Sequence, residues 1–396
     1  MRTSPPLISK TVLLLSFISL FTDIASEMLY PVLPMYLQSV GFSMLFIGVL
    51  EGMAEATAGL SKGYFGHWSD RAGRRKPFIQ LGYGMSAVAK PAMILFSHVA
   101  WVFAMRTLDR LGKGIRTGAR DALLSTETTA ANKASVFGFH RGMDTLGAAI
   151  GPFIALVFLS FYPSQYQTLF VFALVPGVIA IAISSLIKET RSLPQENIQR
   201  PGFLDFLGYW KSSPSSYKKL VAALIFFSLT NSSDVFLLLM LKKHGLNDSA
   251  VIGVYVFYNL VYAASSYPIG RLTDKIGFKW SLLVGLALFA FTYLGMSEIN
   301  RPSFYWFLFF SYGLYAACTE GMSKAWITNL VPAHYTATAI GFYTSFSSIA
   351  LMFASILAGY LWSAVSPAAP FWLGGIGALI TLLFLAITPI SNQLKP

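Results

Sequence analysis

The sequence predicts an all-α membrane protein in which twelve transmembrane helices form two pseudo-symmetric bundles of six. Three observations support this fold class. The 396 residues are 55% hydrophobic and only 12% charged, which leaves too few charges to cover a solvated surface. Apolar runs long enough to cross a bilayer recur along the chain, and short motifs of the first half return at matching places in the second.

The individual helices follow from the thickness of the bilayer. A hydrocarbon core about 30 Å thick needs roughly 20 apolar residues at a rise of 1.5 Å each. In chain order, the runs of this kind are 11–37, 43–67, 77–97, 101–124, 134–161, 167–187, 220–241, 250–272, 280–297, 304–330, 336–363 and 371–390. The first run carries Asp23 and Glu27 and is too long for a signal-peptide core, so we expect a retained helix.

The basic residues predict the orientation. The net charge of +12 would suggest a nucleic-acid partner in a soluble protein, but basic loops retained in the cytoplasm explain it here. With an even number of passes both termini lie on one side, and that side carries eighteen loop Lys and Arg against three on the other. We therefore expect cytoplasmic termini, in the inner membrane of a bacterium, and no nucleic-acid partner.

One long connection divides the chain. Residues 188–219 contain three prolines, nine charges and no sustained apolar run. We expect six-helix domains at 1–188 and 220–396, joined by a cytoplasmic linker at 189–219. Within the linker, residues 202–209 fit a short amphipathic helix at the membrane surface and a plain loop about equally well.

The two halves share motifs at a nearly constant displacement. Gly66, Asp70, Arg71 and Gly73, followed by Arg74, Arg75 and Lys76, come after the second run. Glycine, acid, base and glycine recur 204 residues later at Gly270, Asp274, Lys275 and Gly277. Gly138-Phe139 and Gly341-Phe342 open the fifth and eleventh runs 203 residues apart. Two such parallel repeats are one way to build an alternating-access carrier with its binding site between them.

The loop from Gly66 to Lys76 resembles the signature loop of the major facilitator superfamily, and the loop from Gly270 to Lys279 resembles its second copy. The resemblance implies that Asp70 accepts backbone hydrogen bonds at a neighbouring helix N-terminus and pairs with the loop arginines, which closes a gate. A carboxylate is stabilised by helix-terminal amides. The alternative is that the bases only fix topology by binding anionic headgroups.

Two further motifs resemble signatures of this superfamily. Arg110 followed by Gly114 resembles a signature of proton-driven members, from which Lys113 and Arg116 depart. The fifth run resembles the antiporter signature at Gly138, Gly147, Gly151 and Pro152, with Ala155 and Leu156 in place of its closing glycine pair. The first implies coupling to protons and the second implies export; close helix packing would also explain the glycines.

Eight acids and eight bases fall inside or at the edge of the expected helices. Each ionised group near the bilayer centre costs at least about 2.5–3.5 kcal/mol, so these side chains must face protein or water. Asp23 and Glu27 share one helix face, and charges at steps of three and four form a stripe along 106–120. The resemblance places the first, fourth, seventh and tenth helices around a cavity. It implies a proton-coupling or cavity role for Asp23, Glu27, Arg106, Asp109, Arg110, Asp234, Glu320 and Lys324.

Asp23, Glu27 and Asp234 are the leading candidates for proton-carrying acids; the alternative is that they are permanently ionised partners of arginines. A secondary polar cluster contains His140, Arg141, Asp144, Glu51 and Glu55. The sequence is compatible with two roles for His140, relaying protons or packing against neighbouring helices. The expected substrate contacts are Asn231, Tyr258, Asn259, Tyr262, Tyr312 and Tyr315. Packing between helices would explain these residues equally well.

We expect a monomeric secondary transporter that uses the proton gradient to export an amphiphilic organic compound such as a drug or siderophore. The alternatives are proton-coupled import or uniport of a small organic anion and, remotely, a membrane-embedded enzyme or receptor. The chain has no nucleotide-binding Walker loop, no Gly-x-Ser-x-Gly and no His-x-x-x-His, so we predict no enzyme, cofactor or metal site. The single Cys318 excludes an internal disulfide.

Overall fold

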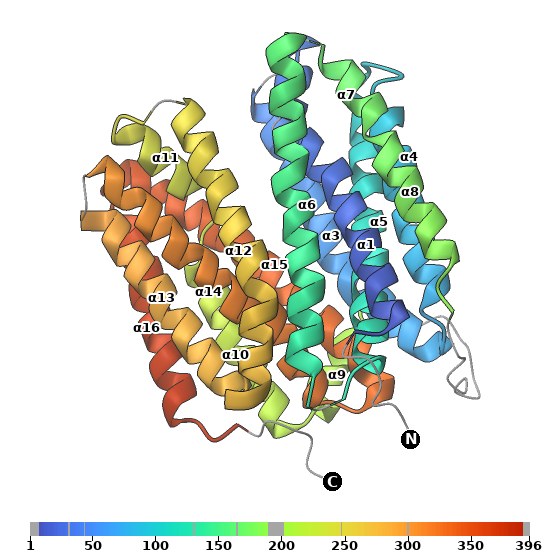
Figure 1. Ribbon diagram of the computed structural model, residues 1–396, viewed down its shortest axis with the longest axis vertical. Helices are drawn as coiled ribbons and strands as arrows, with labels where there is room; N and C mark the ends of the chain where they lie inside the picture. Colours follow the sequence, from blue (N-terminus) through green and yellow to red (C-terminus); the bar gives the residue numbers. More distant parts are fainter. Residues whose placement is uncertain are drawn as a thin grey trace. The chain divides into compact units, whose positions relative to one another are not determined.

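The computed structural model describes residues 8–390 apart from 31, 43, 130, 164, 189–201, 247, 299 and 300, and every regular element within them is helical, as predicted. Figure 1 shows how these helices run. The α-helices are α1 Lys10–Leu29, α2 Val32–Ser39, α3 Met44–Ala72, α4 Lys76–Ala92, α5 Val99–Thr126, α6 Lys133–Phe161, α7 Tyr166–Phe172, α8 Leu174–Ser185, α9 Tyr209–Ser212, α10 Ser215–Thr230, α11 Val235–Lys243, α12 Asp248–Ile276, α13 Phe278–Glu298, α14 Pro302–Asn329, α15 Thr336–Ala364 and α16 Ala369–Ile387. Short 3₁₀ turns are η1 Asp205–Gly208 and η2 Ala333–Tyr335.

Each of the twelve expected runs falls on one helix or on a pair of helices. The first run is divided into α1 and α2, the sixth into α7 and α8, and the seventh into α10 and α11. Seven segments are long and apolar enough to cross a membrane by length and composition alone: Lys10–Leu29, Lys133–Phe161, Tyr166–Ser185, Ser215–Lys243, Phe278–Glu298, Ala333–Ala364 and Ala369–Ile387. Helix α5 is not among them because charged residues recur along it.

Contacts group the chain into two compact units. Unit 1 contains Met1–Thr128, Met143–Tyr209 and Ala333–Ser345, and unit 2 contains Thr129–Gly142, Trp210–Pro332 and Phe346–Pro396. In unit 1, α5 packs against α3 and α4, while α8 packs against α1 and α4. In unit 2, α14 packs against α12 and α13, while α16 packs against α10 and α13. The beginnings of α6 and α15 each belong to the unit that does not hold the rest of that helix.

Glycines let helix backbones meet where the polar residues of unit 1 lie. A Cβ added at Gly82 of α4 would be 2.5 Å from the Gly112 carbonyl oxygen of α5. A Cβ added at Gly147 of α6 would be 2.5 Å from the Leu20 carbonyl oxygen of α1 and 3.0 Å from the Asp23 Cβ. Small residues allow this close approach in membrane helices. The glycines of the fifth run therefore have a direct packing role beside Asp23.

The repeated loops also match in detail. Gly73 and Gly277 follow α3 and α12 with φ of 59° and 92°, a left-handed conformation that favours glycine after a helix. Lys76 Nζ donates to the carbonyl oxygens of Ser185 at 2.9 Å and Ile187 at 2.6 Å, at the end of α8. Lys279 Nζ donates in the same way after α16, to Ala386 at 2.9 Å and Thr388 at 3.2 Å. A lysine at a helix C-terminus satisfies carbonyls that have no partner within the helix.

The described part of the linker is helical rather than a plain loop. Residues 205–208 form the 3₁₀ turn η1, and α9 follows directly. Phe206 and Tyr209 are buried, whereas Leu204 and Leu207 are exposed, so the turn is attached to the protein by one face. The first part of the predicted linker, 189–201, lies outside the described residues.

Candidate functional site

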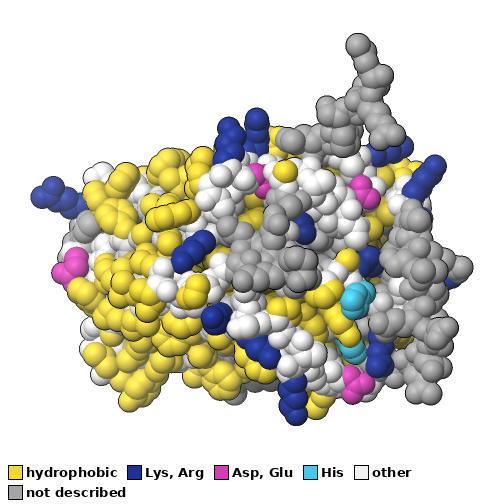
Figure 2. All heavy atoms as spheres, turned by 90° about the horizontal axis from the view of Figure 1, so that it is seen from below, with side chains coloured by type: hydrophobic (Ala, Val, Ile, Leu, Met, Phe, Trp, Pro, Cys, Tyr) yellow, Lys and Arg dark blue, Asp and Glu magenta, His cyan; other side chains and the backbone are white. Residues whose placement is uncertain are grey.

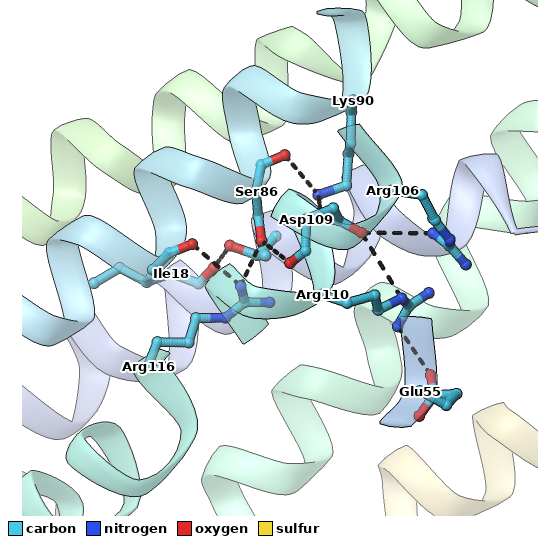
Figure 3. A network of polar contacts seen from close by, with 10 residues as sticks. Ile18, Glu55, Ser86, Lys90, Arg106, Asp109, Arg110 and Arg116 are labelled. Carbon is cyan, nitrogen blue, oxygen red and sulfur yellow. Dashed lines mark hydrogen bonds and ion pairs between the residues drawn. The ribbon is translucent and has the colours of Figure 1, made fainter. Parts of the chain in front are cut away.

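A buried ion-pair network in unit 1 is centred on Asp109 of α5 (Figure 3). Lys90 Nζ on α4 donates to Asp109 Oδ1 and to the Ser86 carbonyl oxygen, both at 3.1 Å. Arg106 and Arg110 approach Asp109 Oδ2 at 3.5 and 3.9 Å. Three cations therefore surround one carboxylate, and the charge of Asp109 is fully compensated.

The network continues towards the surface and along α5. Arg110 pairs with Glu55 of α3 at 3.4 Å, and the Glu55 side chain is 54% exposed. Arg116 donates to Ser86 Oγ at 2.8 Å and lies 4.5 Å from the centre of the Tyr83 ring. These contacts tie α3, α4 and α5 together, which indicates a structural role for the stripe on α5. The side chain of Glu51, also predicted in the secondary cluster, lies outside the described part of the structure.

A second cluster in unit 1 joins α1, α5 and α6 through acids. The carboxyl groups of Asp23 and Asp144 lie close enough to act on each other. Ser19 donates to Asp144 Oδ1 at 2.5 Å, and Arg120 donates to Ser19 Oγ at 3.1 Å. Arg120 also pairs with Asp121 at 2.9 Å and reaches Asp144 at 3.8 Å. Two neighbouring carboxyl groups repel each other when both are ionised, so this cluster brings together two acids of different helices whose charges are coupled.

Lys113 lies on the exposed side of unit 1. Lys113 belongs to the membrane helix α5, and its side chain is exposed. The charge of Lys113 acts on the carboxyl groups of Asp23, Glu27 and Glu55. A cation and carboxylates that are not fully buried within a membrane span must face water or a polar ligand rather than lipid. These four residues therefore mark a hydrated face of unit 1. Lys113 was outside the predicted site set, although its place on the charged stripe was a signal for it.

In unit 2, the break between α10 and α11 carries the acid Asp234. Asp234 accepts a hydrogen bond from the Tyr312 hydroxyl at 2.7 Å. Within the described residues, Asp234 forms no ion pair with a basic side chain, unlike Asp109. The Tyr293 hydroxyl lies 3.3 Å from Asn231 Oδ1, and Asn231 Nδ2 lies 3.4 Å from the Tyr315 hydroxyl. The acid therefore has neutral hydroxyl and amide groups around it, and the carboxylate of Glu320 is near enough for its charge to act on Asp234.

Tyrosine rings pack around this acid. The ring of Tyr312 lies 5.0 Å from that of Tyr258 and 5.2 Å from that of Tyr315. All three rings are buried, so their main contribution in this structure is packing between α12 and α14. Asn259, another predicted contact, donates to the Tyr255 carbonyl oxygen at 3.0 Å and is satisfied within α12.

The predicted cluster around the fifth helix is divided between the units. Arg141 forms an ion pair with Glu320 of α14 and donates from Nε to the Tyr262 hydroxyl at 2.6 Å, both in unit 2. Asp144 instead joins Asp23 in unit 1. His140 is buried and Lys324 is half-buried, and each interacts with other residues.

The first signature loop makes a defined contact in unit 1. Asp70 Oδ2 accepts hydrogen bonds from the Thr338 backbone N–H at 2.8 Å and from its hydroxyl at 3.0 Å, at the start of α15. Arg75 approaches Asp70 Oδ1 at 3.5 Å and donates to the Ala333 carbonyl oxygen at 3.4 Å. This is the geometry that the resemblance implies for Asp70. Within the described residues Arg71 and Arg74 form no such ion pair with it.

The second copy repeats the contact in unit 2. Asp274 accepts from the backbone N–H groups of Ala134 at 2.8 Å and Ser135 at 2.9 Å, and from the Ser135 hydroxyl. Both acids lie beyond the expected membrane spans, which end at residues 67 and 272. Burial raises the pKa of Asp70 to about 7, against the opposing effects of Arg75 and Thr338. Burial also raises the pKa of Asp274, while Ser135 and Ala134 lower it.

Apolar helices with buried ion pairs, a hydrated polar face and duplicated loop contacts define an integral membrane protein of the transporter class. A family model described as Major Facilitator Superfamily matches residues 15–257 and 220–395. The chain belongs to this family. Its members are generally not enzymes.

Individual relatives agree with this assignment. The chain is 33% identical over 387 residues to an uncharacterized MFS-type transporter of Methanocaldococcus jannaschii, covering 96% of this chain and 94% of the relative. It is 23% identical over 297 residues to Citrate exporter 1 of Aspergillus niger, covering 69% of this chain and 56% of that protein. The crystal structure of the human organic anion transporter MFSD10 (TETRAN) superposes with a TM-score of 0.80 at 16% identity, covering 96% of this chain and all of that one. This likeness confirms the predicted fold class.

Proposed function

We propose that the protein is a proton-coupled secondary transporter that works by alternating access and exports an amphiphilic organic compound. The observation that carries the proton coupling is Asp234, an acid in a break of the seventh expected span that is bonded to a neutral tyrosine hydroxyl. A lone carboxylate in a membrane span is costly. Protonation removes this cost, and access to water restores the charge, so the group can load and release a proton in each cycle.

Tyr312 suits both states of this acid. A tyrosine hydroxyl can donate to an ionised carboxylate and, after rotation of its O–H, accept from a protonated one. The short Tyr312–Asp234 contact of 2.7 Å therefore persists through loading and release. The Asp23–Asp144 pair in unit 1 provides a second place for a proton. Asp109, held by Lys90 and two arginines, is assigned a structural role instead.

Orientation and gating complete the proposal. Lys and Arg side chains outnumber Asp and Glu on the face seen in Figure 2, which supports placing one loop-bearing face in the cytoplasm. We assign both termini to that side, in a bacterial inner membrane. Release of Thr338 from Asp70 and of Ser135 from Asp274 would then open the cytoplasmic side.

A second candidate is transport of a small organic anion. Lys113 favours it because it is an exposed cation on the hydrated face of unit 1, next to Arg110 on the same stripe. The similarity to a citrate exporter points to the same chemistry. In this case Lys113 would meet the carboxylate of the substrate, and the tyrosines of unit 2 would only pack.

Transport in proteoliposomes tests the proposal. A pH gradient is imposed, labelled compounds of both classes are screened, and internal pH is followed with a trapped dye. We expect uphill substrate movement with opposite proton movement in the wild type, and loss of both in Asp234→Asn. Exchange of labelled for unlabelled substrate without a gradient should survive in this variant. Glu298→Gln, at an exposed acid at the end of α13, is the matched control and should behave like wild type.

The outcomes separate the candidates. Unchanged proton movement in Asp234→Asn would end the assignment of that acid, and the same result in Asp23→Asn would remove the second proton position. Selective uptake or release of di- and tricarboxylates, with a raised KM in Lys113→Gln, would replace the amphiphilic substrate by the organic anion.

A further inference from the structure

The linker presents aromatic residues at every third position. Phe203, Phe206 and Tyr209 are three residues apart, which is the repeat of a 3₁₀ turn, and η1 at 205–208 adopts this conformation. Phe203 and Tyr209 flank this turn, and Phe203 is 52% exposed. Phe206 and Tyr209 are 2% and 6% exposed, although a surface linker has no need to bury aromatic rings.

Each of these rings meets a partner in unit 1 on α3, η2 or α15. Phe203 packs on Tyr64 of α3, with 5.5 Å between ring centres. The ring centre of Tyr209 lies 5.2 Å from that of Tyr335 of η2, just before α15. The Tyr209 side chain is also close enough to Asp70 to interact electrostatically with it. The turn thus spans the contact between α3 and the beginning of α15.

Phe206 occupies the middle of this contact. Its ring centre lies 6.4 Å from that of Phe342 on α15. A Cβ added at Gly63 of α3 would be 2.5 Å from the Phe206 ring, and the three nearest atoms all belong to that ring. A Cβ added at Gly341 would be 2.5 Å from the Lys62 carbonyl oxygen and 3.0 Å from the Gly63 Cα. Gly63 therefore touches Gly341 and makes room for Phe206.

We propose that residues 203–209 form a latch that holds the beginning of α15 against α3, so that Phe206 must leave Gly63 and Phe342 before Thr338 can separate from Asp70. The aromatic area buried by the latch stabilises this contact only while α3 and α15 are together. The linker then sets how readily the gate opens, in addition to joining the two halves. This inference rests on the alternation proposed above.

Cysteine labelling tests the latch without a transported substrate. Ser345 is the reporter position, because it is 1% exposed and its hydroxyl donates to the Gly59 carbonyl oxygen of α3 at 2.6 Å. Ser345→Cys is introduced together with Cys318→Ser, and its reaction with an impermeant maleimide is timed in inside-out membrane vesicles. We expect Phe206→Ala to raise the labelling rate about tenfold, which corresponds to a closed contact weaker by about 1.4 kcal/mol.

Leu204→Ala is the matched control, since Leu204 is on the same turn but 56% exposed. It should change the rate by less than about twofold, as surface substitutions usually do. Phe206→Leu, which keeps apolar bulk without the ring, should give an intermediate rate and remains informative if Phe206→Ala folds poorly. Wild-type labelling in both Phe206 variants, or an equal rise in Leu204→Ala, would overturn the latch.

Gly63→Ala adds a test on the opposite side of the contact. Its new methyl group meets only the end of the Phe206 side chain among its nearest neighbours, so it should expel the ring and raise labelling like Phe206→Ala. Combined with Phe206→Ala it should add nothing, whereas independent, additive effects would contradict the latch. Asp70→Ala separates the two proposals: if it raises labelling and the Phe206 variants do not, only the latch fails, and if none does, the gate fails as well.

Discussion

Unit 1 and unit 2 have the same loop contacts but different polar interiors. In unit 1, Asp109 is surrounded by Lys90 and arginines. In unit 2, Asp234 is bonded to a tyrosine hydroxyl at the end of an interrupted helix. Asp109 is thus compensated by several cations, whereas Asp234 has a neutral hydrogen-bond partner.

Comparing the two units shows that the loop contacts are the same in both copies of the repeat, whereas the contacts of the buried acids differ. The loop acids, the left-handed glycines and the capping lysines keep the same contacts in both copies. These residues connect neighbouring helices in the same way in each unit. The buried acids have diverged in partner and position, as expected if the two halves supply different parts of one transport cycle.

The largest effect should come from breaking the compensated network. Asp109→Asn leaves Lys90 and two arginines buried without their carboxylate, so we expect the free energy of unfolding to fall by about 3–5 kcal/mol. Thermal unfolding in detergent measures this loss. Glu55→Gln, at the exposed end of the same network, should cost less than about 1 kcal/mol. Equal losses in the two variants would show that the network does not act as a buried unit.

The gate contact in unit 1 should respond to pH. Burial raises the pKa of Asp70 from 3.8 to about 7 while it is bonded to Thr338. Release into water returns the pKa to its ordinary value. The closed contact, in which the pKa of Asp70 is raised, is favoured at low pH. This stabilisation of the closed contact is lost as the pH rises from about 4 to about 7. The labelling rate of the Ser345→Cys reporter, divided at each pH by that of the same thiol in denatured protein, should therefore increase from about pH 4 to about pH 7. Asp70→Asn should abolish this increase in the corrected rate.

His67 is another titratable group at this contact, and its ordinary pKa lies near the pH range of the test; its Nδ1 lies 3.2 Å from the Thr338 hydroxyl. His67→Gln should keep the pH dependence. If His67→Gln abolishes it and Asp70→Asn does not, the histidine is the titrating group and our assignment is wrong.

The capping lysines should show that the two copies are equivalent. Lys76→Met and Lys279→Met each remove a cation from a helix C-terminus, and each should lower the free energy of unfolding by about 0.5–1 kcal/mol. Thermal unfolding of both variants and of their combination measures this, and the two losses should add. A large loss in one copy only would limit the structural repeat to the loop acids.

The smallest change in stability should occur at Asp234, the acid to which we assign proton coupling. Asp234→Asn keeps an oxygen that accepts from Tyr312, and it removes a charge that has no basic partner in the described residues. We expect the free energy of unfolding to change by less than about 1 kcal/mol. A loss as large as that of Asp109→Asn would show that Asp234 is structural, and the contrast between the units would disappear.

Local patterns in the sequence predicted the helices and the gate loops, but they did not predict the long-range pairs. Apolar length located the twelve runs, and repeated motifs located Asp70 and Asp274. The interruption at 231–234 was missed because it lies within an apolar run. Spacing on one helix grouped Arg141 with Asp144, whereas contacts between helices assign them to different partners. Lys90 meets Asp109 through the close contact of α4 with α5, which depends on tertiary packing.

Helices α3, α5 and α15 meet at Gly118 of α5 with almost no side chain between their backbones. A Cβ added at Gly118 of α5 would lie 3.0 Å from the Gly66 Cα and 3.3 Å from the Ala337 carbonyl oxygen. Gly118 is one helical turn before Asp121, which pairs with Arg120 in the cluster of Asp23 and Asp144. With bare backbone on both sides there is no compressible side chain to absorb a shift of α5. In the proposed transport cycle, a shift of α5 would therefore be transmitted directly to Ala337, the residue next to Thr338.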